Sequence, residues 1–243
     1  MKKDITNRTP SVNYLCRMKM IILGVIALLI SCSTLTRPPK LPSVTGNGVD
    51  HYASAHLDST GLSKEIFEMA LKGMHRLDSM GLLSNPNILT IIDYEQSSNK
   101  KRLYVIDVKY DTLLFHTWVA HGRNTGDEFA KSFSNEEGSL KSSLGFYITG
   151  NTFTGSHTGL SLTIKGVEKG FNDRAEKRAI IIHSASYVTE RFITHFGRLG
   201  RSFGCPVVPP DQIKPILETI GNGTVLFIYY PDRQYLSTSS LLK

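Results

Sequence analysis

The chain has 243 residues, of which 40% are hydrophobic and 20% are charged, and its formal net charge is +7. These values are ordinary for a globular protein with one sizeable domain and exclude a fibrous or a disordered chain. Residues 1–31 contribute five basic residues and one acidic residue, so the rest of the chain has 23 basic and 20 acidic residues and a balance of only +3. Because no aromatic-interleaved basic stripe accompanies this small surplus, we expect no nucleic-acid partner.

The first segment, residues 1–32, has the pattern of a targeting sequence. A basic stretch leads into eleven apolar residues, 20–30. As a helix they reach only about 16 Å, at ~1.5 Å per residue, whereas a bilayer core needs about 20 residues. The segment therefore predicts export rather than a membrane-spanning helix. Met18 and Met20 both stay open as alternative translation starts.

This segment ends in Leu29-Ile30-Ser31-Cys32, which resembles a bacterial lipobox, and that resemblance predicts a lipid anchor on Cys32. The alternative is an ordinary signal peptide that happens to contain a cysteine. Ser33 is not an acidic retention signal, which favours the outer membrane over the inner one. We therefore expect an exported, periplasm-facing lipoprotein.

Three further regions follow along the chain. Residues 33–60 are rich in Ser, Thr, Pro and Gly, which is typical of a flexible tether. Residues 61–85 contain apolar side chains at helical spacing, with Ser63 as the expected N-cap and Gly81 as the expected stop. Residues 86–243 form the expected catalytic domain.

Short segments rich in β-branched and aromatic residues dominate this last region. The expected strands are 88–93, 103–108, 113–120, 145–149, 160–164, 179–183 and 224–230, and one helix is expected over 211–220. Pro215 leaves the start of that helix open. The polar residues 124–142 fit either a lid over a cleft or a disordered insertion. The sequence thus predicts a mostly-β fold with few helices.

Cys205 and His183 are the candidate catalytic pair. Once Cys16 is removed and Cys32 carries lipid, Cys205 is the single thiol of an exported domain. It follows the glycine- and arginine-rich run Gly197-Arg198-Leu199-Gly200-Arg201-Ser202-Phe203-Gly204. The arginines would favour the thiolate or hold a substrate carboxylate. His183 ends the apolar strand, where it can act as the base for the thiol, and the N–H groups near Gly204 are candidates for an oxyanion site. The alternative is an inert buried thiol.

These two segments resemble the catalytic signature of the L,D-transpeptidases, the YkuD-like family. The signature pairs a strand ending in His-Gly or His-Ser with Ser-x-Gly-Cys, here Ile182-His183-Ser184 and Ser202-Phe203-Gly204-Cys205. The run Gly-Arg-Ser-x-Gly-Cys-Pro is closest to one branch of the family. Further matches are Val119-Ala120-His121-Gly122, Ser142-Ser143-Leu144-Gly145-Phe146-Tyr147 and Phe227-Ile228-Tyr229-Tyr230.

The resemblance implies a β-sandwich-like catalytic domain and a role for each matched residue. Cys205 is the implied nucleophile and His183 its base, with the carbonyl of Ser184 orienting the imidazole. Ser202 and Gly204 would shape the cysteine loop and the oxyanion site. The implied substrates are peptidoglycan stem peptides: a tetrapeptide donor loses its terminal D-alanine, and a neighbouring amine resolves the thioester into a 3→3 cross-link. No cofactor or metal is implied.

Two departures from the family pattern concern substrate contacts. Phe203 stands where many members have His or Lys, and Pro206 follows the cysteine where many have an arginine nearby. Arg198 or Arg201 would replace that arginine. His157, in a polar loop, is either a residue lining the donor cleft or an ordinary surface histidine.

The acceptor stays open between a stem peptide, water, a free D-amino acid and a protein amine. Water would make the protein an L,D-carboxypeptidase. The alternative from another class is a non-catalytic peptidoglycan-binding lipoprotein, and a further one is a protease acting on ordinary L-peptides. The oligomeric state is not predicted.

Overall fold

The computed structural model describes residues 50–243, and these lie within the second of the chain's two units, Thr45–Lys243. The signal segment, Cys32 and most of the expected tether lie outside the described residues. No helix among the described residues is long and apolar enough to cross a membrane.

The end of the expected tether is folded. Residues 50–60 contain helix α2 (His51–Ser54) and the single 3-10 turn η1 (Leu57–Ser59), whose Leu57 is fully buried. The expectation of a flexible tether up to residue 60 therefore needs correcting, and it stays a prediction only for residues 33–49. An apolar residue such as Leu57 in a largely polar stretch does not by itself predict packing, so the sequence did not indicate that residues 50–60 pack on the domain.

The predicted helix after the tether is present as α3 (Lys64–Ser79). Ser63 caps it by accepting a hydrogen bond from the Ile66 N–H, as its position before the first apolar residue predicts. Its buried face includes Gly73, which packs directly against Phe146 of the sheet. Phe146 in turn stacks on Phe227, with ring centroids 4.3 Å apart. The helix is thereby fixed to the centre of the core.

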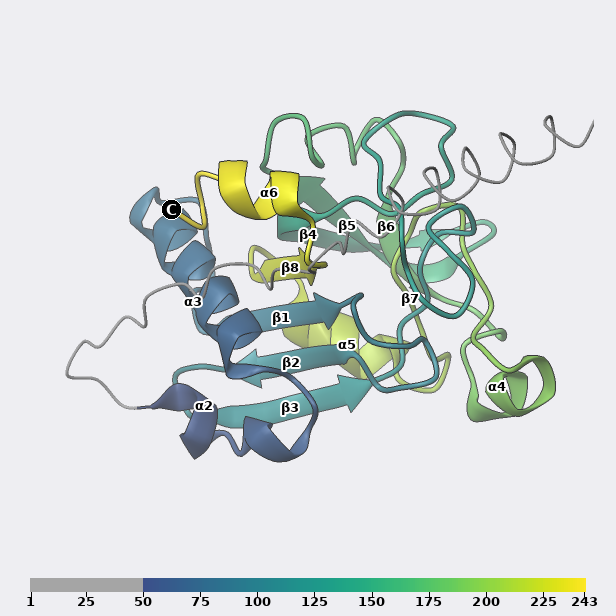
Figure 1. Cartoon of the computed structure of the whole chain (residues 1–243), viewed down its shortest axis with the longest axis horizontal. Helices are drawn as coiled ribbons and strands as arrows, with labels where there is room; N and C mark the ends of the chain where they lie inside the picture. The colour runs from purple at the N-terminus through teal and green to yellow at the C-terminus, as the bar shows by residue number, and fades with distance from the viewer. Residues whose placement is uncertain (1–49) are drawn as a thin grey trace, which may run out of the picture. The chain divides into compact units, whose positions relative to one another are not determined.

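One eight-stranded sheet makes up most of the described chain (Figure 1). Its spatial order is β3-β2-β1-β8-β4-β5-β6-β7. The strands are β1 (Ile88–Asp93), β2 (Leu103–Asp107), β3 (Thr112–Thr117), β4 (Gly145–Gly155), β5 (Gly159–Gly166), β6 (Ile181–Ser184), β7 (Val207–Val208) and β8 (Val225–Tyr229). The predicted mostly-β, sandwich-like class is confirmed, and each predicted strand has a counterpart.

The pairing is antiparallel except at two places, where β1 lies parallel to β8 and β6 lies parallel to β7. The two ends of the sheet nearly meet, because Ala120, three residues beyond β3, bridges Val207 of β7. Strands β1 and β8 are buried along their whole length, which explains their unbroken apolar sequences.

Three further helices complete the described fold. They are α4 (Glu190–Phe196), α5 (Ile213–Ile220) and α6 (Arg233–Thr238). In α5, Pro215 falls in the first turn, where a missing N–H leaves no helical hydrogen bond unmade. In Figure 1, α5 lies behind β1 and β2, and it contacts β1 and β5.

The buried carboxylate of Glu168 holds the C-terminal helix on the sheet. It accepts hydrogen bonds from the Phe146 N–H, the Tyr235 hydroxyl and the Ser239 hydroxyl. Burial raises its pKa, and the bonds from Ser239, Phe146 and Tyr235 oppose that shift. A buried carboxylate with three donors is a satisfied structural group, so it marks a packing junction rather than a second site.

We expect Gly73→Ala to destabilise the fold by about 1–3 kcal/mol because it overpacks the core. A Cβ at this position would lie 2.0 Å from Phe146 Cζ. At an exposed helical site the same change would stabilise by up to about 1 kcal/mol, so the sign of the effect tests the packing. The measurement is the free energy of unfolding in urea. The control, Glu68→Ala on the exposed face of α3, should change it by under about 0.5 kcal/mol, and a more stable Gly73→Ala protein would contradict the contact.

Candidate active site

The β6–β7 pairing brings the two predicted catalytic residues together. His183 is paired in register with Val207, and Ser184 with Val208. Cys205 stands two residues before Val207, so it enters beside β6 at the level of Ile181. Neighbouring strands lie about 4.8 Å apart, so this register places Cys205 and His183 on neighbouring backbone segments of the same sheet.

His183 has the orientation that the family resemblance implies. Its Nδ1 lies 3.1 Å from the main-chain oxygen of Ser184. If Nδ1 carries the proton and donates it there, Nε2 keeps a lone pair for accepting a proton. Burial lowers the pKa of this imidazole, while the bond to Ser184 opposes the shift. A neutral, oriented imidazole is the form that a general base requires.

Cys205 is half-buried, and its thiol donates to the main-chain oxygen of Ala179 at 3.8 Å. Burial raises the pKa of the thiol, whereas the Ile181 N–H and the positive charge of Arg178 lower it. Ala179 has a left-handed φ of 52°, which breaks the predicted strand over 179–183 and turns its carbonyl toward the sulfur. Among the described hydrogen bonds none joins the thiol to His183. Burial favours the neutral form of both the thiol and the imidazole.

The loop before Cys205 is held by two serines. Ser202 Oγ donates to the oxygen of Cys205 at 2.7 Å and accepts from the Gly204 N–H at 3.0 Å. Ser142 Oγ donates to the Gly204 oxygen at 3.0 Å. Gly204 has φ 132°, and a Cβ there would lie 2.9 Å from the oxygen of Lys141, so this close approach requires glycine.

The main-chain N–H groups of Gly204 and Cys205 differ in whether they already have an acceptor. Because the Gly204 N–H already donates to Ser202, it is not available to an oxyanion in this arrangement. The Cys205 N–H has no backbone acceptor among the described residues. The Gly204 N–H thus serves the shape of the loop, and the oxyanion role predicted for this region stays a prediction.

Arg178 is a functional candidate that the sequence analysis did not identify. Its guanidinium donates to the oxygens of Ser134 and Lys141, at 2.8 and 2.6 Å, and to the hydroxyls of Ser139 and Ser143. None of these partners carries a charge, and Arg178 makes no ion pair within the described residues. A positive charge with no directly bonded carboxylate thus stands beside the Gly204–Cys205 loop, and Glu136 and Glu137 act on it only through space. Its only sequence signal was its place at the start of the histidine strand.

Arg178 also anchors residues 124–142, which are neither disordered nor detached. Thr125, Ala130 and Asn135 are buried, and Ser142 packs against the cysteine loop. The segment therefore forms one wall of the site in this structure. Whether it moves as a lid stays a prediction.

The two arginines predicted to act on the thiol face a different group. Arg201 donates to Asp127 at 2.6 Å and to the oxygens of Arg123 and Gly126. Arg198 donates to the Leu199 oxygen at 2.7 Å and lies 3.9 Å from Asp127. Both line a cavity of about 390 Å³ beside the cysteine loop. Its other lining residues are Arg123, Tyr187, Phe192, Gly200 and Phe203.

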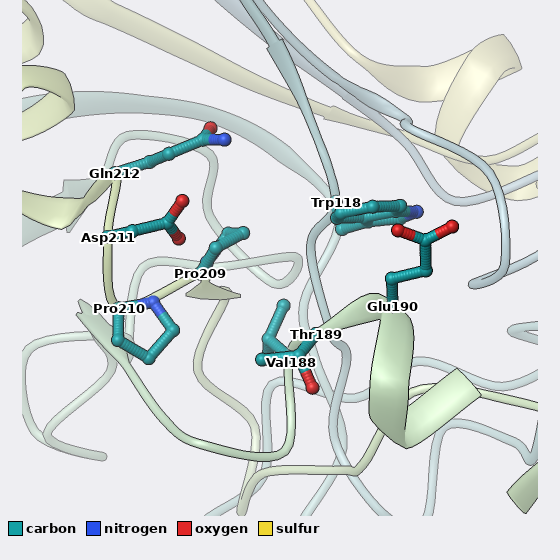
Figure 2. A pocket seen from close by; sticks show the side chains of 8 residues that line it. All are labelled: Trp118, Val188, Thr189, Glu190, Pro209, Pro210, Asp211 and Gln212. Carbon is teal, nitrogen blue, oxygen red and sulfur yellow. The ribbon is translucent and has the colours of Figure 1, made fainter. Parts of the chain in front are cut away.

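A second cavity, of about 380 Å³, has the opposite charge (Figure 2). Trp118, Val188 and Pro209 form apolar walls, and Glu190 and Asp211 project toward the space between them. The Trp118 indole N–H is not free, because it donates to the Asn99 oxygen at 3.1 Å. Trp118 and Cys205 both pack against a small apolar cluster that includes Val188.

The remaining histidines differ in position. His157 is exposed in the turn that joins β4 and β5, and no contact to Cys205 or His183 is present among the described residues. Its role in the donor cleft stays a prediction. His121 is buried beneath the site, where Arg102 donates to its Nδ1 at 2.8 Å. Burial, with the Arg102 charge, lowers the pKa of His121 to about 3, so it is a neutral structural group.

Within residues 50–243 no group of three or more His, Cys, Asp or Glu side chains could hold a metal ion. The absence of a cofactor stays a prediction.

The described site thus contains a thiol just before β7 and an oriented imidazole on β6. The chain belongs to the L,D-transpeptidase catalytic domain family, whose profile matches residues 58–229. The Gly-Arg-Ser-x-Gly-Cys-Pro branch stays a prediction. No curated protein matches the chain.

Several solved structures resemble the described fold. An L,D-transpeptidase from Mycobacterium smegmatis is 10% identical, with a TM-score of 0.37, and the match covers 59% of each chain. The helical cell shape determining protein Pgp2 (K307A mutant) from Campylobacter jejuni is 15% identical, with a TM-score of 0.40, over 67% of this chain and 57% of that one. Bd1075 from Bdellovibrio bacteriovorus is 18% identical, with a TM-score of 0.39, over 61% of this chain and 50% of that one. The matches thus cover between half and three-fifths of those chains.

We expect Arg178→Met to raise the pKa of the Cys205 thiol, because the nearby positive charge that favours the thiolate is lost. The rate of alkylation by iodoacetamide follows the thiolate fraction, so it should fall about tenfold near pH 7 and its pH profile should shift upward. Arg178→Lys, which keeps a charge, should give an alkylation rate between those of the wild-type protein and Arg178→Met. Arg174→Met, an exposed arginine paired with Glu136, is the control and should leave the profile unchanged. An unshifted profile for Arg178→Met would remove Arg178 from the electrostatics of the thiol.

Proposed function

We propose that this protein is a cell-envelope L,D-transpeptidase that acts on peptidoglycan stem peptides through a thioester on Cys205. The observation that supports it best is the register of β6 and β7, which brings Cys205 alongside the strand that contains His183, whose imidazole is already oriented by Ser184. Membership in the family supports the substrate class. The thioester and the stem-peptide substrate are this proposal's own additions.

Acylation would begin when His183 Nε2 takes the thiol proton. The sulfur then attacks the carbonyl carbon of the third stem residue, and the electron pair of the C=O bond moves onto its oxygen. The Cys205 N–H would stabilise this oxyanion. Collapse breaks the bond to D-alanine, whose nitrogen takes the proton from His183, and the thioester remains.

Deacylation would use the same groups in reverse. An acceptor amine loses a proton to His183 Nε2 as it attacks the thioester carbonyl, and collapse expels the Cys205 thiolate. The thiolate then recovers the proton from the imidazole. An amine of a neighbouring stem peptide gives a 3→3 cross-link, whereas water gives an L,D-carboxypeptidase. A free D-amino acid or a protein amine would use the same step.

The competing account is a non-catalytic peptidoglycan-binding lipoprotein. It keeps the cleft but has no need of the thiol. Burial raises the pKa of the Cys205 thiol, and the Ile181 N–H and the Arg178 charge oppose that shift; a tether has no need of these opposing groups. The exported lipoprotein, facing the periplasm from the outer membrane, is the proposed setting of either account.

The Cys205→Ala protein separates these accounts. We expect the purified protein to convert tetrapeptide-rich peptidoglycan fragments into dimers with release of D-alanine, and Cys205→Ala to lose this activity at least about 10³-fold because the nucleophile is gone. Mass spectrometry identifies the products and the acyl-enzyme. His183→Gln should slow both acylation and alkylation. Tripeptide products alone would establish the carboxypeptidase, and fragments left intact by the wild-type protein while both proteins bind them would favour the tether.

We expect the anchor to depend on Cys32, because the lipobox places the modified thiol there. Cells fed a labelled fatty acid should incorporate the label into the wild-type protein and not into Cys32→Ser, while Cys16→Ser should keep it. Label retained by Cys32→Ser would point to an ordinary signal peptide. Fractionation of the two membranes tests the proposed location.

A further inference from the structure

We infer that the arginine-lined cavity beside Cys205 binds the free α-carboxylate of the donor's terminal residue, and that Arg123 is the residue that binds it. This inference rests on the proposed function, since it concerns the substrate of the same site. It differs from the sequence-based hypothesis, which gave this task to Arg198 or Arg201.

The backbone places Arg123 next to the nucleophile loop. Gly122 and Ser202 form a parallel bridge, and the Arg123 N–H donates to the Ser202 oxygen at 2.7 Å. The Arg123 guanidinium lies over the Phe203 ring, 5.9 Å from its centroid. Phe203 is two residues before Cys205. Tyr187, which lines the same cavity, packs in the apolar cluster that includes Cys205.

The distances suit a leaving residue with a free carboxylate. The reacting carbonyl must come within about 3.5 Å of the sulfur. In the donor, the terminal carboxylate carbon follows that carbonyl by one residue, about 3.5 Å along an extended chain. The carboxylate therefore lies roughly 7 Å from the sulfur. Phe203, over whose ring Arg123 lies, is two residues before Cys205, which limits the separation of their Cα atoms to about 7 Å.

Of the three guanidinium groups, that of Arg123 is the available one. Arg201 is bound to Asp127 and to two carbonyl oxygens, and Arg198 is bound to the Leu199 oxygen and faces Asp127. The Arg123 side chain has no hydrogen bond or ion pair among the described residues. Stacking on Phe203 uses its face and leaves its N–H edge free for a carboxylate, which it can bind through two parallel hydrogen bonds.

Charge also separates the two cavities. The arginine-lined cavity has three guanidinium groups near a single carboxylate, that of Asp127. The cavity at Trp118 is lined by Glu190 and Asp211 and by no basic residue. A carboxylate-bearing leaving group is attracted to the first cavity and repelled by the second, so the charges favour one placement of the donor's C-terminus.

Binding to the Cys205→Ala protein tests the inference without requiring turnover. Titration calorimetry would compare two synthetic stem tetrapeptides, one with a free C-terminal carboxylate and one with a carboxamide. We expect the free acid to bind about 10- to 100-fold more tightly, the usual value of hydrogen bonds to a charged group. In Cys205→Ala/Arg123→Ala this preference should fall to within about threefold, through weaker binding of the acid alone. Arg123→Lys should keep part of it.

The matched control is Arg191→Ala, which removes an exposed arginine of α4 that does not line the cavity. It should leave the preference intact. Equal affinity of the two peptides for the Cys205→Ala protein, or equal weakening of both by Arg123→Ala, would overturn the inference. Either result could occur in an active transpeptidase, so neither would refute the proposed function. If the wild-type protein showed no turnover while the carboxylate preference stayed intact, the proposed function alone would be refuted.

Discussion

The parallel pairing of β6 with β7 is the constraint on which the site depends. A strand of two residues has little stability of its own, yet this one holds Cys205 alongside the strand that contains His183. It is held because Val207 is buried and is also bridged by Ala120 on its other side. The contact that closes the sheet therefore also fixes the position of Cys205 relative to His183. Burial of apolar side chains in the core thus maintains the geometry of the polar site.

Burial favours a neutral Cys205 thiol, and the positive charge of Arg178 lies nearby without being paired to a carboxylate. Burial raises the pKa of Cys205, and the nearest compensating cation, Arg178, is bonded only to neutral oxygens. Had an acid paired with Arg178, the two charges would have largely cancelled at the sulfur. The buried, neutral His121 adds no competing charge beneath the loop. The wall at residues 124–142 and the electrostatics of the nucleophile thus depend on one side chain.

The sequence predicted most of what repeats or is buried, and less of what depends on distant contacts. Strands β1 and β8 could be found because both of their faces are covered, and the catalytic pair because its motif is local in sequence. Strand β7 has only two residues, and the outer half of β4 is exposed, so neither has a pattern to detect. Arg198 and Arg201 were chosen for nearness in sequence to Cys205, but Asp127 faces both. Arg178 acts through residues 134–143, a contact that no spacing rule reveals.

The polypeptide near the thiol separates opposite charges over a short length of chain. Tyr187 lines the arginine-rich cavity, while the next residue, Val188, lines the acidic one. A transpeptidase must bind two peptides of similar composition in opposite roles, one losing a residue that bears a carboxylate and one presenting an amine. Apolar contacts cannot distinguish such partners, because both present the same side chains. Opposite charges in two neighbouring cavities can, since reversing either peptide places like charges together. The arginines and acids of the two cavities would then determine the direction in which the donor binds more than its affinity.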